Sequence, residues 1–225
     1  WIASLASLRP DLIINTGDNL GHPDAVRGIR AAFAGFRGIP GAFVHGSNDL
    51  FASAPRNPLR YFLGPSKNHS REVRLDTEAM DSFFTSTLGW HDVNNAAATV
   101  DVHGRRVNLV GVNDAHRNWD RLDLLPGLFD QLQAASTDLD GDGLADPEAD
   151  PHPLTVAVTH APYRRVLDAF TGAGADVIFG QGNGSSFGML QAVETTKAAD
   201  GGKVMFIDVI GDKTPIDKGH LLSSV

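Results

Sequence analysis

Short apolar runs recur along the chain, and most of them give way to a cluster of polar residues. The first lies in the stretch DLIINTGDNL, where a continuous apolar run stops at Asn-Thr-Gly-Asp-Asn. A continuous run, in contrast to an alternating one, is typical of a strand that is covered on both faces. On this basis we predict strands within five segments: 11–20, 41–50, 154–162, 176–186 and 203–212.

Between the strands, apolar residues recur at the spacing of one helical face. Residues 97–114 are predicted to form a hairpin about His103 and Gly104. This alternation of strands and helices indicates an α/β fold with parallel strands, in a single domain over residues 1–225. Since a helix before a parallel strand usually follows an earlier strand, we expect the sequence to begin inside a fold. The predicted helix faces comprise Trp1, Leu5 and Leu8; Val26, Ile29, Phe33 and Phe36; Met80, Phe83, Phe84 and Leu88; and Val166, Leu167 and Phe170.

Composition narrows the classes of partner. The chain of 225 residues has a net charge of −8, which argues against nucleic acid or an anionic membrane surface as a partner. Six acidic residues lie in segment 138–150, and removing their charges from −8 leaves −2. No run of 18 apolar residues predicts a membrane span, and the lack of cysteine excludes a thiolate metal site. No targeting segment is visible, so a cytoplasmic and an extracytoplasmic location both stay open.

Three of the predicted strands end on a side chain that can bind a metal ion, namely Asp18, Asn48 and His160. Each of these residues could instead serve as a helix cap or a turn residue. The carboxyl ends of parallel strands meet at one edge of a sheet, where open α/β folds bind ligands. Oxygen and imidazole ligands together suit a divalent ion of the Mn, Fe or Zn class. We therefore expect these three side chains to converge around one or two cations.

The order of these clusters resembles that of the calcineurin-like metallophosphoesterase family, in a bacterial branch. TGDNL (16–20) resembles the family's Gly-Asp block, GSND (46–49) its Gly-Asn-His-Asp block, and THAP (159–162) the block with a lone metal-binding histidine. DVIFGQGNGSS (176–186) lies where the family has a Gly-His-x-His block. WIASLASLRPDLIINTGDNLGHPDAV and PRNPLRYFLGPS are also similar, so the resemblance spans about residues 1–180.

The resemblance implies a four-layer α/β/β/α sandwich, truncated at its N-terminus, and the hydrolysis of a small phosphomonoester or phosphodiester by metal-activated water. Asp18 would bridge two metal ions. For proton donation to the leaving group our candidates are Asp49 and His116, while His22, His45 and Asp114 stay open. The implied metal ligands are Asp18, Asn48, His160, Gln181 and Asn183.

The chain also departs from the family pattern. The Asp-x-His block that supplies one metal is absent, and Gln181 and Asn183 occupy the positions of two histidines. Amide oxygens bind transition metals less well than imidazole, so we expect impaired hydrolysis. The alternative is a non-catalytic binding or structural module of the same fold. A dinucleotide-binding turn at Gly180, Gly182 and Gly184 is a further alternative, disfavoured because the glycine spacing is wrong and no helix is predicted after it.

The acidic segment, residues 136–153, carries a separate signal. Aspartates alternate with other residues up to Gly143, as at the start of an EF-hand-type calcium loop, and the segment is similar to the loops of dockerin and thrombospondin type 3 repeats. Ala149 stands where the terminal glutamate of such a loop is expected, so a solvated acidic linker is the alternative. Calcium binding would favour an extracytoplasmic location. The candidate calcium ligands are Asp138, Asp140, Asp142 and Asp146.

Overall fold

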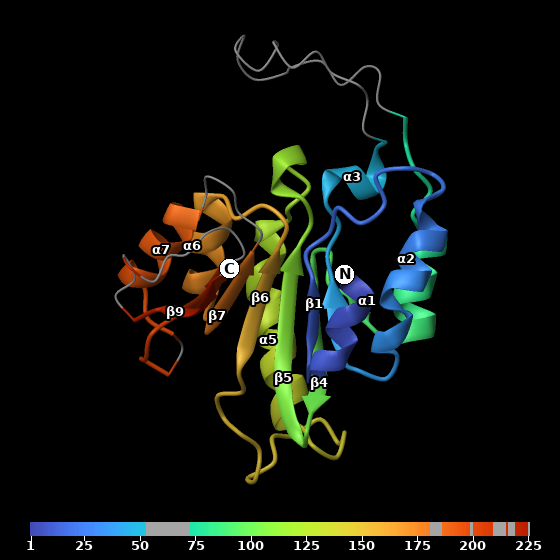
Figure 1. Ribbon diagram of the computed structural model, residues 1–225. Coiled ribbons are helices and arrows are strands. Elements are labelled where there is room, and N and C mark those ends of the chain that lie inside the picture. The colour runs from blue at the N-terminus through green and yellow to red at the C-terminus, as the bar shows by residue number, and fades with distance from the viewer. Residues whose placement is uncertain (53–72, 181–185, 199, 209–214, 216–218, 225) are drawn as a thin grey trace.

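Two β-sheets organise the protein, and Figure 1 shows their strands running side by side through the centre. The computed structural model describes residues 1–52, 73–180, 186–198, 200–208, 215 and 219–224. The smaller sheet has three parallel strands in the order β1 (Ile13–Asn15), β2 (Gly41–Phe43) and β3 (His91–Asp92). The larger sheet has six strands in the order β4 (Ala96–Val102), β5 (Arg105–Val112), β6 (Thr155–Thr159), β7 (Val177–Gly180), β8 (Met205–Asp208) and β9 (Leu221–Ser224).

The larger sheet is mixed. Strands β4 and β5 form the predicted antiparallel hairpin, and its turn residues, His103 and Gly104, both have positive φ angles. Strands β5 to β9 are parallel to one another. The carboxyl ends of β5 and β6 therefore lie at one edge of this sheet, and those of β1 and β2 lie at one edge of the smaller sheet.

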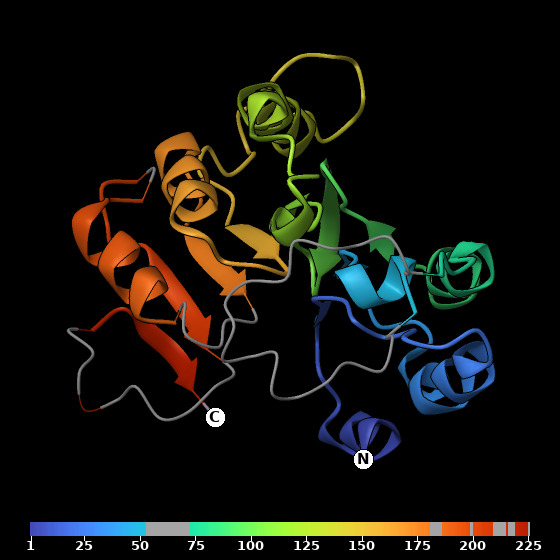
Figure 2. The same ribbon diagram turned by 90° about the horizontal axis from the view of Figure 1, so that it is seen from above.

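Helices connect most of the parallel strands. The first half of the chain contains α1 (Ile2–Leu5), α2 (Ala25–Phe33), α3 (Ser47–Leu50) and α4 (Glu78–Ser82), which continues as a π-helix over Phe83–Leu88. The second half contains α5 (Leu125–Thr137), α6 (Arg164–Ala173) and α7 (Ser186–Thr195). Seen from above, in Figure 2, α1, α2 and α4 lie beside the smaller sheet, and α5, α6 and α7 lie beside the larger one. The predicted α/β class is thus confirmed.

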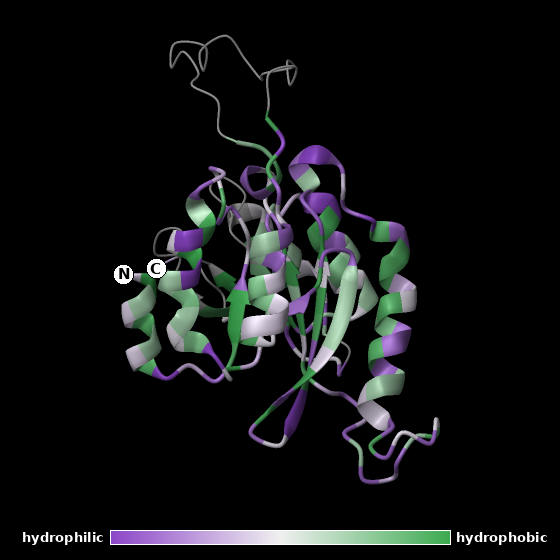
Figure 3. Cartoon of the chain, turned by 90° about the vertical axis from the view of Figure 1, so that its right-hand side faces the viewer, coloured by the Kyte–Doolittle hydropathy of each residue, from purple (hydrophilic) through white to green (hydrophobic). Residues whose placement is uncertain are grey.

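The alternation of side chains along the strands explains why so many apolar runs are continuous. In β6, Val156 and Val158 join a cluster that also contains Ala42 and Val44, whereas Ala157 packs against helix residues such as Phe170. Both faces of the strand are covered, so neither set of positions needs to be polar. Figure 3 shows the same arrangement, with apolar strands inside and helices that carry one apolar and one polar side.

Several predicted elements need correction. The predicted helix face at the start of the chain is partly buried only at Leu5, because Trp1 and Leu8 are 89% and 74% exposed and α1 gives way to a 3-10 turn over Ala6–Leu8. The prediction that no helix follows the glycine-rich loop is wrong, since α7 begins at Ser186. Helix α5 and strands β3 and β9 were not predicted. Within the described residues, no helix is both long and apolar enough to cross a bilayer, in line with the expectation of no membrane span.

Candidate metal centre

The loop after β1 brings a carboxylate to the sheet edge. Asp18 has a left-handed backbone, with a φ of 61°. Its Oδ1 accepts a hydrogen bond from the backbone N–H of Asn48 at 3.0 Å, and its Oδ2 accepts one from the Asn48 side-chain amide at 2.8 Å. Because Asn48 belongs to α3, which follows β2, the ends of two neighbouring strands are joined through this carboxylate.

A second carboxylate, Asp49, holds this loop in place. Asp49 is fully buried, and its two oxygens accept four backbone N–H bonds. Three come from the loop after β1, from Asp18 at 2.8 Å, Asn19 at 2.6 Å and Leu20 at 2.8 Å. The fourth comes from Gly46 at 3.0 Å. With its oxygens occupied and no exposure, Asp49 positions the loop that carries Asp18, and the catalytic role predicted for it stays a prediction.

Two glycines allow the loops after β1 and β2 to approach each other. Gly17 has a φ of 92°, and a Cβ there would overlap the backbone nitrogen of Gly46. A Cβ on Gly46 would overlap Asp18 Oδ1 and would lie 2.6 Å from Cε1 of His160. Only glycine fits at either position, because a methyl group would force the carboxylate and the imidazole away from their places.

The loop after β6 adds His160 from the other sheet. The ring is buried, and Nδ1 lies 2.7 Å from the backbone carbonyl oxygen of Thr16. Because a carbonyl oxygen only accepts, Nδ1 carries the proton, and Nε2 of the neutral ring keeps a lone pair. That Nε2 lies 3.6 Å from Asp18 Oδ2. An imidazole that donates one N–H to a carbonyl and directs its other nitrogen at a carboxylate has the orientation of a metal ligand.

The loop after β5 adds an aspartate and a second histidine. Asp114 is fully buried, and its Oδ1 accepts the backbone N–H of His116 at 2.8 Å and lies 3.0 Å from ring Nδ1 of His116. Burial opposes ionisation of Asp114, but the side-chain and backbone hydrogen bonds from His116 outweigh it and hold the pKa of Asp114 below the usual range. The same bond raises the pKa of His116 above its usual value.

These residues form one site. Asp114, His116 and His160 each offer a ligand atom, and the three atoms lie within 4.8 Å of one another. Asp18 flanks the group through His160. The imidazole of His116 also packs edge-on against the ring of Tyr163, with 5.2 Å between centroids. Such a set of carboxylate oxygens and imidazole nitrogens can hold a divalent transition-metal ion.

Other predicted residues lie elsewhere. Gln181 and Asn183, together with the similar segment PRNPLRYFLGPS, fall outside the described residues. His22 is exposed at the chain surface and accepts the N–H of Asp24 through Nδ1. His45 is buried and pairs with Asp81 at 2.8 Å. Sequence reasoning left Asp114 open and missed its burial, although its place after the apolar run of β5 matches that of Asp18 and His160 after theirs.

The acidic segment forms a second group of carboxylates. One ligand atom from each of Asp138, Asp140 and Asp146 lies within 4.8 Å of the others. The oxygens of Asp138 accept the N–H groups of Gly141 at 2.7 Å and Gly143 at 3.0 Å, and Gly143 has a φ of 87°. Asp142 is outside the group and accepts the N–H of Leu144 at 2.8 Å. Three of the four predicted calcium ligands are thus close together, and the fourth is not part of their group.

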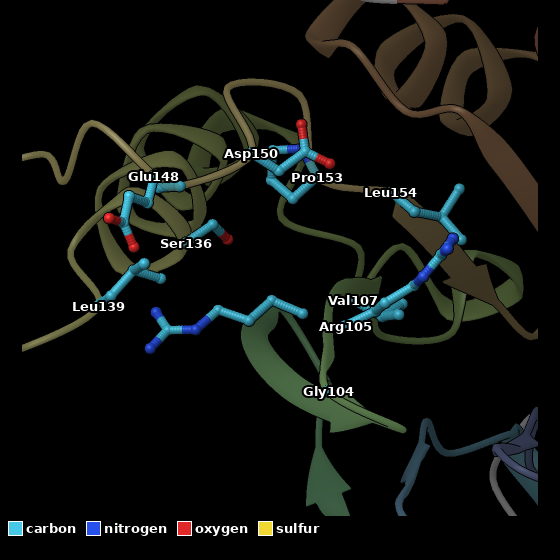
Figure 4. Close-up of a pocket in the computed structure, with 11 residues that line it drawn as sticks. Gly104, Arg105, Val107, Ser136, Leu139, Glu148, Asp150, Pro153 and Leu154 are labelled. Atoms are coloured by element: carbon cyan, nitrogen blue, oxygen red, sulfur yellow. The ribbon is translucent and has the colours of Figure 1, made fainter.

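A hollow of about 410 Å³ lies between this segment and the β4–β5 hairpin. Figure 4 shows Glu148, Ser136 and Leu139 on one side and Arg105 and Leu154 on the other. The hollow is at the amino ends of β5 and β6, which is the edge opposite the metal centre.

Comparison with protein-family models and with curated proteins gave no match to this chain.

Proposed function

We propose that the protein is a metal-dependent phosphoesterase of the calcineurin-like type, built as a four-layer α/β/β/α sandwich. Four apolar clusters support this layering. One fills the space between the sheets, with Ile14 and Ala42 from one and Leu109 and Val158 from the other. Another packs helix α2 against the outer face of the smaller sheet. The remaining two pack α5, α6 and α7 against the outer face of the larger sheet.

The observation that carries the proposal is the meeting of Asp18, Asn48 and His160 at one edge. They come from three strand ends far apart in the sequence, yet Asp18 contacts both of the others. Helix caps and turn residues bond within their own segment, so the local roles considered for these side chains do not explain the long-range contacts.

In this proposal a divalent ion supplies an activated water and polarises a phosphoryl oxygen. The protein's own residues bind the ion and keep its ligands in position. Asp18 contributes negative charge that offsets the ion, and the Thr16 carbonyl keeps the lone pair of His160 Nε2 directed at the centre. Asp49 fixes the backbone that carries Asp18. The substrate is a small phosphate ester, in agreement with the net charge of −8, which disfavours nucleic acid.

The test is hydrolysis of bis-p-nitrophenyl phosphate by the purified chain, before and after removal of metal with a chelator. We expect slow, metal-dependent turnover that returns when Mn²⁺ is added. Asp18→Asn keeps the shape of the side chain and removes its charge, so turnover should fall by at least about 100-fold. Asp11→Asn is the matched control, because Asp11 is an exposed carboxylate that pairs with His103 and lies outside the centre. Equal rates in the wild type and Asp18→Asn would refute the proposal.

The second candidate function is a non-catalytic module of the same fold that binds calcium through its acidic segment. The observation in its favour is that Asp138, Asp140 and Asp146 form their group at the far edge from the metal centre. Calcium accepts an exposed, oxygen-rich and irregular site of this kind. Uptake of calcium without any metal-dependent hydrolysis would favour this module over the phosphoesterase.

A further inference from the structure

The buried carboxylate of Asp114 has an oxygen that the protein leaves without a hydrogen bond. Its Oδ1 is bonded to His116, but Oδ2 is buried and accepts no hydrogen bond from any described residue. A buried carboxylate oxygen without a donor costs free energy that native proteins rarely accept. Asp114 Oδ2 therefore requires a partner other than the described residues.

The two imidazole rings beside the Asp114 carboxylate point to a cation as the missing partner of its oxygen. His116 and His160 each offer a ring nitrogen within 4.8 Å of an Asp114 oxygen. Two imidazoles and one carboxylate form a donor set typical of Zn²⁺, Mn²⁺ and Fe²⁺, whereas Ca²⁺ and Mg²⁺ prefer oxygen ligands alone. The Thr16 carbonyl already fixes the orientation of His160, as an outer-shell partner fixes a metal ligand.

We propose that Asp114, His116 and His160 bind a divalent transition-metal ion, with the loop after β5 supplying ligands that the family resemblance did not include. An ion bound there would be held by the Asp114 carboxylate, whose Oδ2 has no hydrogen bond from a described residue, and by the two imidazoles. His116 then acts as a metal ligand, in place of the proton donor predicted from the sequence. This metal site rests on the proposed function and names its ligands. Binding of the ion is measured without substrate, so it is tested separately from hydrolysis.

The experiment is calorimetric titration of Zn²⁺ into the metal-free full chain, without substrate. We expect the dissociation constant to rise by at least about tenfold in both Asp114→Asn and His116→Gln. Asp11→Asn serves as the matched control, because Asp11 also forms an Asp–His pair, with His103 at 2.6 Å, but is exposed and outside the centre. Its zinc affinity should equal that of the wild type.

Two further measurements keep the test decisive. Thermal unfolding without metal shows whether each variant folds, and His116→Gln is the safer variant because the His116 side chain is 53% exposed. The nitrogen NMR signals of the imidazoles should shift for His116 and His160 when zinc is added. Unchanged affinity in folded His116→Gln, or zinc shifts confined to His160, would overturn the assignment. Zinc binding without phosphoester hydrolysis would refute the proposed function alone.

Discussion

The metal centre and the acidic segment both gather carboxylates, but they do so in opposite ways. At the metal centre, Asp18 and Asp49 bond to parts of the chain about 30 residues away, as Asp49 does with Asp18 and Asn19. In the acidic segment, the aspartates bond to backbone groups at most seven residues away, as Asp140 does with Asp142 at 3.1 Å. Asp49 and Asp114 are fully buried, whereas the acidic segment is largely exposed.

The two groups of carboxylates depend on the fold to different degrees. The metal centre exists only when both sheets are assembled, so its side chains also hold the structure together. The acidic segment is organised by its own turns, so it can change without disturbing the sheets. Variants of the two regions should therefore differ sharply in their effect on stability.

The largest difference is expected between Asp49→Ala and Asp146→Ala. Removing the Asp49 side chain leaves four buried or half-buried N–H groups without their acceptor, and we expect a loss of about 3–5 kcal/mol in the free energy of unfolding. Asp146 accepts the N–H of Leu139 in an exposed loop, so its removal should cost less than about 1 kcal/mol. Urea denaturation measures both, and similar losses would contradict the comparison.

The next difference concerns two glycines with left-handed backbones. A Cβ on Gly17 would overlap the backbone of Gly46, whereas a Cβ on Gly143 would meet nothing within 4 Å. Gly143→Ala should therefore cost about 1 kcal/mol, which is the strain of a left-handed alanine alone. Gly17→Ala adds a steric clash, so we expect at least about 3 kcal/mol by the same denaturation measurement. A smaller loss for Gly17→Ala than for Gly143→Ala would show that the loops after β1 and β2 are not tightly packed.

A smaller effect should depend on pH. Burial lowers the pKa of His45, but the hydrogen bond and charge of Asp81 outweigh it, so the pKa is raised above 6.5. A raised pKa stabilises the fold below pH 6.5, and this contribution is lost as the pH rises through the raised value. Asp81→Asn should thus cost about 1–2 kcal/mol at pH 5.5 and less at pH 8.5. A greater cost at pH 8.5 would mean that the pair is not charged in the folded protein.

The smallest effect is expected from calcium. Exposed loops with few charged ligands bind Ca²⁺ with dissociation constants near 1 mM, so 1 mM calcium should stabilise the protein by only about 0.4 kcal/mol. Asp140→Ala removes one member of the carboxylate group and should abolish the calcium heat in a titration. Asp142→Ala should retain most of it, because Asp142 is outside that group. Equal heats from wild-type and Asp140→Ala protein would identify the segment as a linker.

The sequence predicted most of the strands because their signal is local. The runs in β1 and β6 are continuous because both faces of each strand are covered. The hairpin turn is marked by His103 and Gly104, which both adopt positive φ angles. Strand β3 has only two residues and is defined by its pairing with β2, so no run in the sequence could reveal it. Helix α5 begins with Leu-Pro-Gly and has few buried residues, which weakens its helical pattern.

The candidate site was predicted only in part, for a related reason. Asp18, Asn48 and His160 each end an apolar run, which marks them as strand-end residues. The meeting of His160 with the other two depends on the packing of the two sheets against each other. The positioning role of Asp49 depends on N–H groups from another loop, and the burial of Asp114 depends on packing between sheet and helices. Such roles are set by contacts between distant segments, and a single sequence does not display them.

The metal centre is tested most directly by anomalous X-ray diffraction from crystals grown with Zn²⁺, with data collected at the zinc absorption edge. We expect a strong anomalous peak among Asp114, His116 and His160, beside Asp18, and we expect the same peak to be absent from crystals of His116→Gln. The acidic segment should show no zinc peak of comparable height. A zinc peak confined to Asp138, Asp140 and Asp146, with none at the ends of β5 and β6, would contradict the central claim.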